Sequence, residues 1–196
     1  MRTRRRESVE LPSLEQIEEE RKRLRYRSRY RRTLKSTIAI LVVVAAAAVL
    51  VATLWMPVLR IYGSSMVPTL KDGQLVVCVK TTDFQPGDIA AFYHGNKLLI
   101  KRYIAGPSEW VNIDEDGTVY INGVELDEPY LTEKAFGETN IDLPYQVPDK
   151  RYFLMGDNRD VSIDSRNTAV GCVAADQIVG KVVFRIWPLS EFGPVS

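Results

Sequence analysis

An uninterrupted apolar run separates two parts of the chain that differ in pattern. No charged residue lies between Lys35 and Arg60, and residues 37–56 supply about 30 Å of α-helix at 1.5 Å per residue. This length covers one crossing of a lipid bilayer. Trp55 stands at an aromatic-belt position near its end, and Pro57 is expected to stop the helix.

A cleaved secretory signal peptide is the alternative interpretation of this run. Ala46 to Ala48 offers the small residues of a cleavage site. However, the apolar part of a signal peptide has about 7 to 15 residues and its basic part is short, whereas here 35 residues precede a longer run. We therefore expect an uncleaved anchor over residues 36–57.

Short apolar runs rich in β-branched and aromatic residues follow the anchor. Gly, Pro, Asp and Asn separate them, and none keeps a helical period over three turns, so the pattern predicts an all-β, antiparallel domain over residues 58–196. Asn122-Gly123 indicates a type I′ hairpin turn, and Asp116-Gly117 indicates another tight turn. The stretch 126–149 is expected to be an ordered excursion rather than a linker. The apolar runs are LVVCVK, DIAAFY, KLLIKRYIA, WVNID, TVYING, RYFLMG and KVVFRIWP.

The charge distribution gives the expected orientation. Residues 1–35 hold 13 Lys/Arg and 6 Asp/Glu, whereas residues 36–196 hold 13 and 19. Arg21 to Lys35 contains nine basic residues and no acid, which by the positive-inside rule places the N-terminus in the cytoplasm. Residues 1–35 are thus expected to be a cytoplasmic basic leader, helical after Ser13, whose basic end lies on anionic membrane lipids. Because the folded part is not basic, we expect no nucleic-acid partner.

The composition limits the chemistry available to the outer domain. Two cysteines exclude a disulfide framework and a four-cysteine zinc site, and a single histidine, His94, makes a multi-histidine metal centre or a Ser-His-Asp triad a poor interpretation. Residues 112–117 mimic the start of a calcium loop, but Gly123 stands where a bidentate Glu is needed. We therefore expect no metal and no cofactor. Cys78 and Cys172 are expected to be buried apolar side chains; a Cys172 nucleophile partnered with His94 is an alternative that no sequence signal supports.

Three segments are harder to explain as scaffold. Residues 63–70 form a small-residue turn that combines a hydroxyl with a proline-fixed exit. Residues 99–104 place Lys101 inside an apolar strand, where alternation puts it on the same face as Leu99. Residues 156–166 are dense in groups that form side-chain networks.

Together, in this order and after a single anchor, these segments resemble the bacterial type I signal peptidases, membrane serine proteases that remove signal peptides from exported proteins. Four ordered blocks carry the resemblance: S-M-x-P-T-L at 65–70, G-D-I at 87–89, K-R at 101–102, and G-D-N-R-x-x-S-x-D-S-R at 156–166. The length and single anchor are similar to the compact form of the family. The resemblance implies preprotein substrates and a location near the export machinery.

Carried over by position, the resemblance implies that Ser65 is the nucleophile and Lys101 the general base. Ser162 would orient the lysine, and Asp164 and Arg166 would form a supporting salt bridge. The chemistry agrees, because a serine hydroxyl needs a proton acceptor. A neutral lysine can accept the proton if apolar surroundings lower its pKa by about two units or more.

The resemblance also implies an oxyanion hole and a substrate pocket. Gly63 stands where some members carry a hydroxyl that donates to the oxyanion, so the second donor here is expected to be a backbone group or water. A shallow apolar slot accepts small residues and excludes bulk sterically, so we expect broad cleavage after small residues at −1 and −3. The residues that correspond to the family's pockets are Ile61, Met66, Leu70, Leu99 and Ile100.

Two alternative functions are weighed against a signal-peptide endopeptidase of the cell membrane. A LexA-like self-cleaving protein shares the Ser/Lys logic, but this chain has an anchor and no DNA-binding module. A non-enzymatic anchored β-module would require the loss of Ser65 or Lys101, and both are present.

Overall fold

The computed structural model describes residues 13–195 and divides into two compact units, Met1–Leu50 and Val51–Ser196. Residues 1–12 and Ser196 lie outside the described residues, and with them the first part of the expected leader. The division into leader, anchor and outer domain at residues 35/36 and 57/58 stays a prediction.

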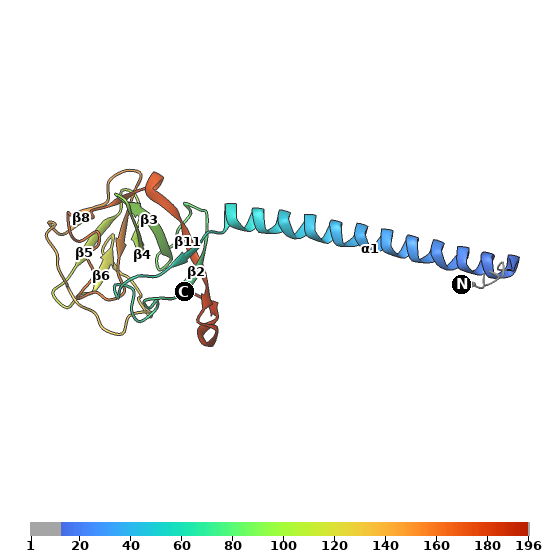
Figure 1. Cartoon of the computed structure of the whole chain (residues 1–196). Helices are drawn as coiled ribbons and strands as arrows, with labels where there is room; N and C mark the ends of the chain where they lie inside the picture. Colours follow the sequence, from blue (N-terminus) through green and yellow to red (C-terminus); the bar gives the residue numbers. More distant parts are fainter. Residues whose placement is uncertain (1–12, 196) are drawn as a thin grey trace, which may run out of the picture. The chain divides into compact units, whose positions relative to one another are not determined.

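A single helix, α1 (Leu14–Trp55), contains both the described part of the leader and the apolar run (Figure 1). At its start the Ser13 hydroxyl accepts the Gln16 N–H at 3.3 Å, and the Gln16 side chain accepts the Ser13 N–H at 3.0 Å. This reciprocal pair satisfies two backbone donors that have no partner within the helix. The helix ends before Pro57, as predicted. Its most apolar stretch has a mean hydropathy of 2.8 and is not buried within the protein, so α1 is long and apolar enough to cross a membrane.

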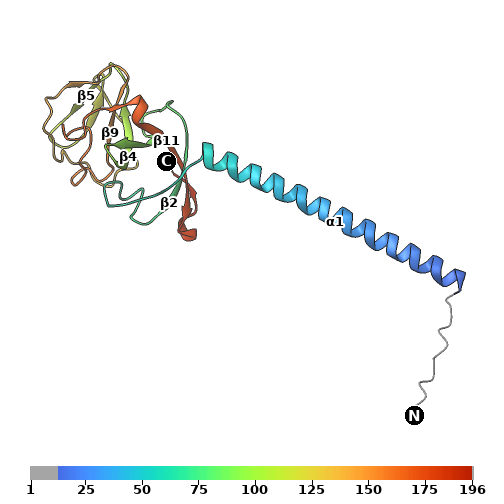
Figure 2. The same ribbon diagram turned by 45° about the horizontal axis from the view of Figure 1, so that its top comes forward.

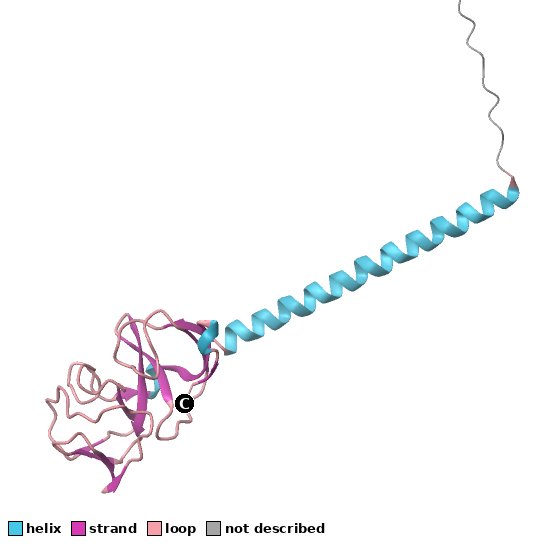
Figure 3. Ribbon diagram, turned by 90° about the horizontal axis from the view of Figure 1, so that it is seen from below, coloured by secondary structure: helices cyan, strands magenta, loops and turns pink. Residues whose placement is uncertain are grey.

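The second unit is built from β-strands joined by turns and long loops (Figure 3). All strand pairs among the described residues are antiparallel, which confirms the predicted fold class. The strands are β1 (Val58–Arg60), β2 (Leu75–Val79), β3 (Ile89–His94), β4 (Lys97–Ala105), β5 (Trp110–Ile113), β6 (Val119–Ile121), β7 (Val124–Glu125), β8 (Tyr145–Gln146), β9 (Arg151–Met155), β10 (Val173–Ala174), β11 (Ile178–Trp187) and β12 (Gly193–Pro194), with short 3₁₀ helices η1 (Ala175–Gln177) and η2 (Leu189–Glu191).

The strands form two sheets. The larger one has the order β1-β2-β11-β3-β4-β9-β10, with β12 paired to β11, and the smaller one has the order β7-β6-β5-β8. Strands β4, β9 and β11 of the larger sheet can be followed in Figure 2. In the smaller sheet Asn122 and Gly123 have φ values of 52° and 82°, which confirms the predicted hairpin turn.

Apolar packing on the larger sheet supports the segment that follows β1. Ile61, Met66 and Leu70 belong to one buried cluster with Val76 and Cys78 of β2. Because these side chains come from both ends of the 61–78 segment, their burial holds the intervening turn against the sheet. This turn carries the first of the segments singled out in the sequence.

The excursion over residues 126–149 is an ordered part of the second unit. Glu128 forms a buried ion pair with Arg159, and the Phe136 carbonyl accepts a hydrogen bond from the Arg166 guanidinium at 2.7 Å. Gly137 lies so close to these groups that a Cβ there would meet the Arg159 carbonyl and the Arg166 side chain. The excursion is therefore fixed to the loop that follows β9.

Candidate active site

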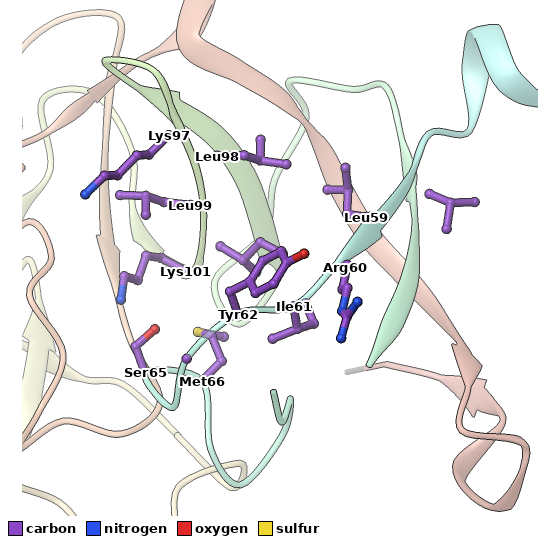
Figure 4. Close-up of a pocket in the computed structure, with 13 residues that line it drawn as sticks. Leu59, Arg60, Ile61, Tyr62, Ser65, Met66, Lys97, Leu98, Leu99 and Lys101 are labelled. Carbon is purple, nitrogen blue, oxygen red and sulfur yellow. The ribbon is translucent and has the colours of Figure 1, made fainter. Parts of the chain in front are cut away.

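A groove of about 520 Å³ brings two of the three singled-out segments together. One wall consists of residues 58–63, 65 and 66, and the other consists of residues 97–101 of β4. Ser65 and Lys101 both line it, and in Figure 4 the Ser65 hydroxyl and the Lys101 amine point toward one another. Within residues 13–195, the Ser65 hydroxyl and the Lys101 amine form no direct hydrogen bond with one another. Hydrogen bonds between catalytic groups are often longer in ligand-free sites than in the reacting complex.

Backbone hydrogen bonds fix the turn that carries Ser65. The N–H of Leu70 donates to the Met66 carbonyl at 2.8 Å, which closes one helical turn just after Ser65. The Ser65 carbonyl accepts the Asn158 N–H at 3.0 Å, which ties this turn to the loop after β9. The backbone N–H of Ser65 itself has no partner among the described residues and is available to a substrate oxygen.

Lys101 lies in the middle of β4 with only 4% of its surface exposed. Strand alternation directs it to the same side as Lys97 and Leu99, as Figure 4 shows. Its Nζ donates to the Ser162 Oγ at 2.8 Å. Burial lowers the pKa of Lys101 to about 8, because an ammonium loses hydration there; the charge of Asp164 opposes this shift.

A close backbone approach places Ser162 beside Lys101. At Gly156, the first residue after β9, a Cβ would collide with the Ser162 side chain and with the Ser65 carbonyl. Glycine is thus required where the Ser65 turn and the Ser162 loop meet. Gly156 is the first residue of the G-D-N-R block, so the sequence did indicate a special position here. The sequence did not indicate that Ser162 and Ser65 are the residues that approach it.

Asp164 and Arg166 form a fully buried ion pair beneath this loop, with Arg166 Nε 2.9 Å from Asp164 Oδ1. The Gly156 N–H also donates to Asp164, at 2.9 Å. Burial alone would raise the pKa of Asp164, but the hydrogen bonds and charge of Arg166 outweigh it and lower this pKa below its usual value. The carboxylate therefore stays ionised and holds the backbone of the loop.

Gly63 adopts φ = +86°, a conformation that residues with a Cβ rarely accept. Its N–H donates to Asp72 Oδ1 at 2.8 Å. This N–H is therefore already engaged within the turn. Gly63 lines the groove, but its backbone N–H does not supply a second oxyanion donor in this arrangement.

Four of the five expected pocket residues line the groove: Ile61, Met66, Leu99 and Ile100. Leu70 is not among the residues that line the groove and its side chain is completely buried, so its place in the substrate pocket stays a prediction. The helical turn at residues 66–70 directs Leu70 inward, where it packs in the same cluster as Met66.

Several residues at the site were not identified from the sequence. Tyr62 lines the groove with 76% of its surface exposed, and the Arg60 guanidinium lies 5.4 Å from its ring centroid. Beside Lys101, Arg102 is fully buried and binds both carboxylate oxygens of Asp157, at 2.7 and 2.6 Å. Arg102 and Asp157 both stood in the quoted blocks, but their 55-residue separation gave no signal that they pair.

The alternative thiol chemistry has no support in the structure. Cys78 and Cys172 are buried and free, as expected, and burial raises the pKa of the Cys172 thiol to about 11. A thiol in this state is a poor nucleophile because the thiolate is the reactive form.

Among residues 13–195 there is no cluster of three or more His, Cys, Asp or Glu side chains suited to a metal ion.

Comparisons with known proteins show what the chain is similar to. Residues 33–187 match the family described as "Signal peptidase, peptidase S26". The chain is 42% identical over 153 residues to signal peptidase IB of Staphylococcus aureus (strain COL), covering 67% of this chain and 78% of that protein. It is 37% identical over 166 residues to signal peptidase I of Bacillus licheniformis, covering 78% and 88%. A crystal structure of a signal peptidase I from Enterococcus faecalis V583 matches with a TM-score of 0.44 and 32% identity, covering 50% of this chain and 96% of that one.

Proposed function

The chain belongs to the signal peptidase family, peptidase S26, and is a serine peptidase that removes signal peptides; within it we propose that Ser65 is the nucleophile and Lys101 the general base. The observation that carries this proposal is the buried Lys101 amine, which shares a groove with Ser65 and has a pKa lowered to about 8. At that pKa a substantial fraction of the amine is neutral near physiological pH and can accept a proton.

In the first half of the reaction, the neutral Lys101 amine takes the proton of the Ser65 hydroxyl as Oγ attacks the carbonyl carbon of the scissile peptide bond. The oxygen of the tetrahedral intermediate receives a hydrogen bond from the Ser65 N–H. The resulting ammonium then gives its proton to the leaving nitrogen, the C–N bond breaks, and the signal peptide remains as an ester on Ser65.

In the second half, Lys101 takes a proton from a water molecule that attacks the ester carbonyl. Collapse of this second intermediate returns a proton to Ser65 and releases the signal peptide with a free carboxylate. Ser162 acts as a positioning residue, because its hydroxyl accepts a hydrogen bond from the amine at 2.8 Å. Asp164 and Arg166 act indirectly, because their ion pair and the hydrogen bond from Gly156 fix the loop that carries Ser162.

The groove supports cleavage after small residues at positions −1 and −3 of the preprotein. Ile61, Met66, Leu99 and Ile100 present apolar surface without side-chain hydrogen-bonding groups. Apolar walls select by volume, so Ala, Gly or Ser fit while large side chains collide with the walls.

A substrate series tests this specificity. Replacing the −1 Ala of a good Ala-x-Ala peptide by Trp is expected to lower kcat/KM by at least about 100-fold, because a rigid packed wall cannot accommodate an indole. The measurement is peptide hydrolysis by the full chain in detergent or lipid, with Ser and Gly at −1 as controls that should be cleaved. Equal cleavage of the Trp peptide would mean that the pocket assignment is wrong.

We further propose that residues 36–57 anchor the protein once in the cell membrane, with residues 1–35 in the cytoplasm and residues 58–196 outside. The helix α1 is long and apolar enough for this role, and the nine basic residues between Arg21 and Lys35 favour the cytoplasmic side. The same residues are proposed to contact anionic lipids. A position near the export machinery would bring preproteins to the groove.

Protease protection tests the orientation. In intact, wall-stripped cells that express the protein with an N-terminal epitope tag, added protease is expected to degrade the outer domain and leave the tag protected. Permeabilised cells provide the control, because there the tag should be lost as well. Loss of the tag in intact cells would show that the orientation is reversed.

A further inference from the structure

A second groove is lined in part by the residues that follow Ser65 in its turn. It has a volume of about 460 Å³ and is lined by Val67 and Pro68, by parts of residues 132–135, and by residues 157–160. Its residues come from the turn after Ser65, from the excursion and from the loop after β9. None of the residues that line the first groove lines this one.

The two grooves are lined by successive residues of the turn that carries the proposed nucleophile. Ser65 and Met66 line the first groove, and the next two residues, Val67 and Pro68, line the second. Asn158 lines the second groove and donates its N–H to the Ser65 carbonyl at 3.0 Å. A peptide bound in the first groove up to Ser65 therefore has the second groove close to the residues that follow its scissile bond.

The linings differ in a way that assigns a direction. The first groove is lined mainly by apolar side chains, with Arg60, Lys97 and Lys101 as its charged members, and suits the small, apolar end of a signal peptide. The second is lined by charged and polar groups, including Glu133 and Asp160, and suits the polar start of a mature protein. We propose that the second groove binds the first residues after the scissile bond, and that it favours basic over acidic side chains there; this rests on the proposed function of Ser65.

The sign of the preference follows from which charges are already neutralised. Asp157 is paired with Arg102, and Arg159 is paired with Glu128, in fully buried ion pairs that set the shape of the wall. Lys134, next to Glu133, instead contacts Glu125 at 3.1 Å.

Glu133 and Asp160 are exposed and have no ion-pair partner among residues 13–195. They leave the groove with a net negative field. A lysine or arginine of the substrate is attracted there, and an acidic residue is repelled.

Two matched peptides test the proposal with the unmodified full chain. They share an Ala-x-Ala sequence before the scissile bond and carry either two Lys or two Glu at the second and third positions after it. We expect kcat/KM to be about three- to tenfold higher for the Lys peptide at low salt, because exposed charge pairs contribute modestly. The ratio should shrink toward 1 at high salt, because screening weakens such contacts. A ratio of 1 at low salt, or a preference for Glu, would overturn the proposal.

Variants then locate the preference. Glu133→Lys/Asp160→Lys should reverse the ratio, and the milder Glu133→Gln/Asp160→Asn, which keeps the side-chain shapes, should bring it to about 1. Asp83→Lys/Asp176→Lys makes the same change of charge at two exposed positions that line neither groove, and should leave the ratio unchanged. Each variant is compared through its own ratio of two peptides, so a general loss of turnover does not affect the result.

The outcomes separate this inference from the proposed function. If Ser65→Ala still cleaves peptides, the nucleophile assignment fails, whatever the charge preference. If Ser65→Ala is inactive but the lysine variants keep the wild-type ratio, only the role of the second groove is excluded.

Discussion

Ser65→Ala is expected to lower signal-peptide cleavage by at least about 10⁴-fold, the scale on which serine peptidases lose activity when the nucleophile is removed. The proposed reaction passes through an ester on the Ser65 oxygen, and alanine has no atom that could form it. The protein should remain folded, because the Ser65 side chain makes no hydrogen bond within residues 13–195. Cleavage of an Ala-x-Ala peptide by the purified full chain is the measurement.

Ser64→Ala is the matched control for this prediction. Ser64 is the adjacent serine, it is exposed, and its side chain does not line the groove. It should keep activity within about threefold of the wild type. Substantial cleavage by a folded Ser65→Ala protein would exclude Ser65 as the nucleophile. Absence of cleavage by the wild type in detergent and in lipid would instead favour a non-enzymatic role.

Replacement of Lys101 is expected to cause the second large loss of activity. It distinguishes a role of Lys101 as a general base from a role as a positive charge. Lys101→Arg keeps the positive charge but cannot accept a proton at accessible pH. It should be as inactive as Lys101→Met, which keeps the apolar stem and removes the amine. Both should lose at least about 10³-fold in kcat/KM. Because an arginine at this buried position could disturb the strand, thermal unfolding of both variants must first show a folded domain.

The pH dependence of kcat/KM tests the role of Lys101 as general base without a substitution. Burial lowers the pKa of Lys101 to about 8, so the amine is protonated and inactive below this pH and neutral above it. The wild-type kcat/KM should therefore rise about tenfold per pH unit below about pH 8 and level off above it. His94→Ala should keep this profile, because His94 lies at the end of β3 and does not line the groove.

A different outcome would identify another base. If a folded Lys101→Arg protein kept substantial turnover, the Ser65/Lys101 dyad would be wrong. Lys97 would then be tested next, because it lies on the same face of β4 and also lines the groove.

Patterns that repeat along the chain were readable from the sequence alone. The run over residues 37–56 and the proline after it predicted where α1 ends, because a helix cannot continue through the prolyl ring. Alternation predicted β4 at Lys97–Ala105 and the shared side of Leu99 and Lys101, because it depends only on neighbouring residues. The order of motifs around Ser65 and Lys101 predicted the family.

Contacts between distant segments could be decided only by the tertiary structure. Ile61 and Leu70 are both apolar and both pack in the cluster against β2, but of these two residues Ile61 alone also lines the groove. The pairing of Arg102 with Asp157 depends on how β4 and the loop after β9 meet, which no local pattern encodes.

The chemistry of the site depends on the same tertiary contacts. Lysine ordinarily has a pKa near 10.5, and the type of residue at position 101 does not change this. The value falls to about 8 because folding removes water from the amine. Folding also places Ser162 beside the amine, through a contact that only glycine at position 156 permits. The sequence determined which groups are present and in what order, whereas burial by distant segments decided which of them can act as a base.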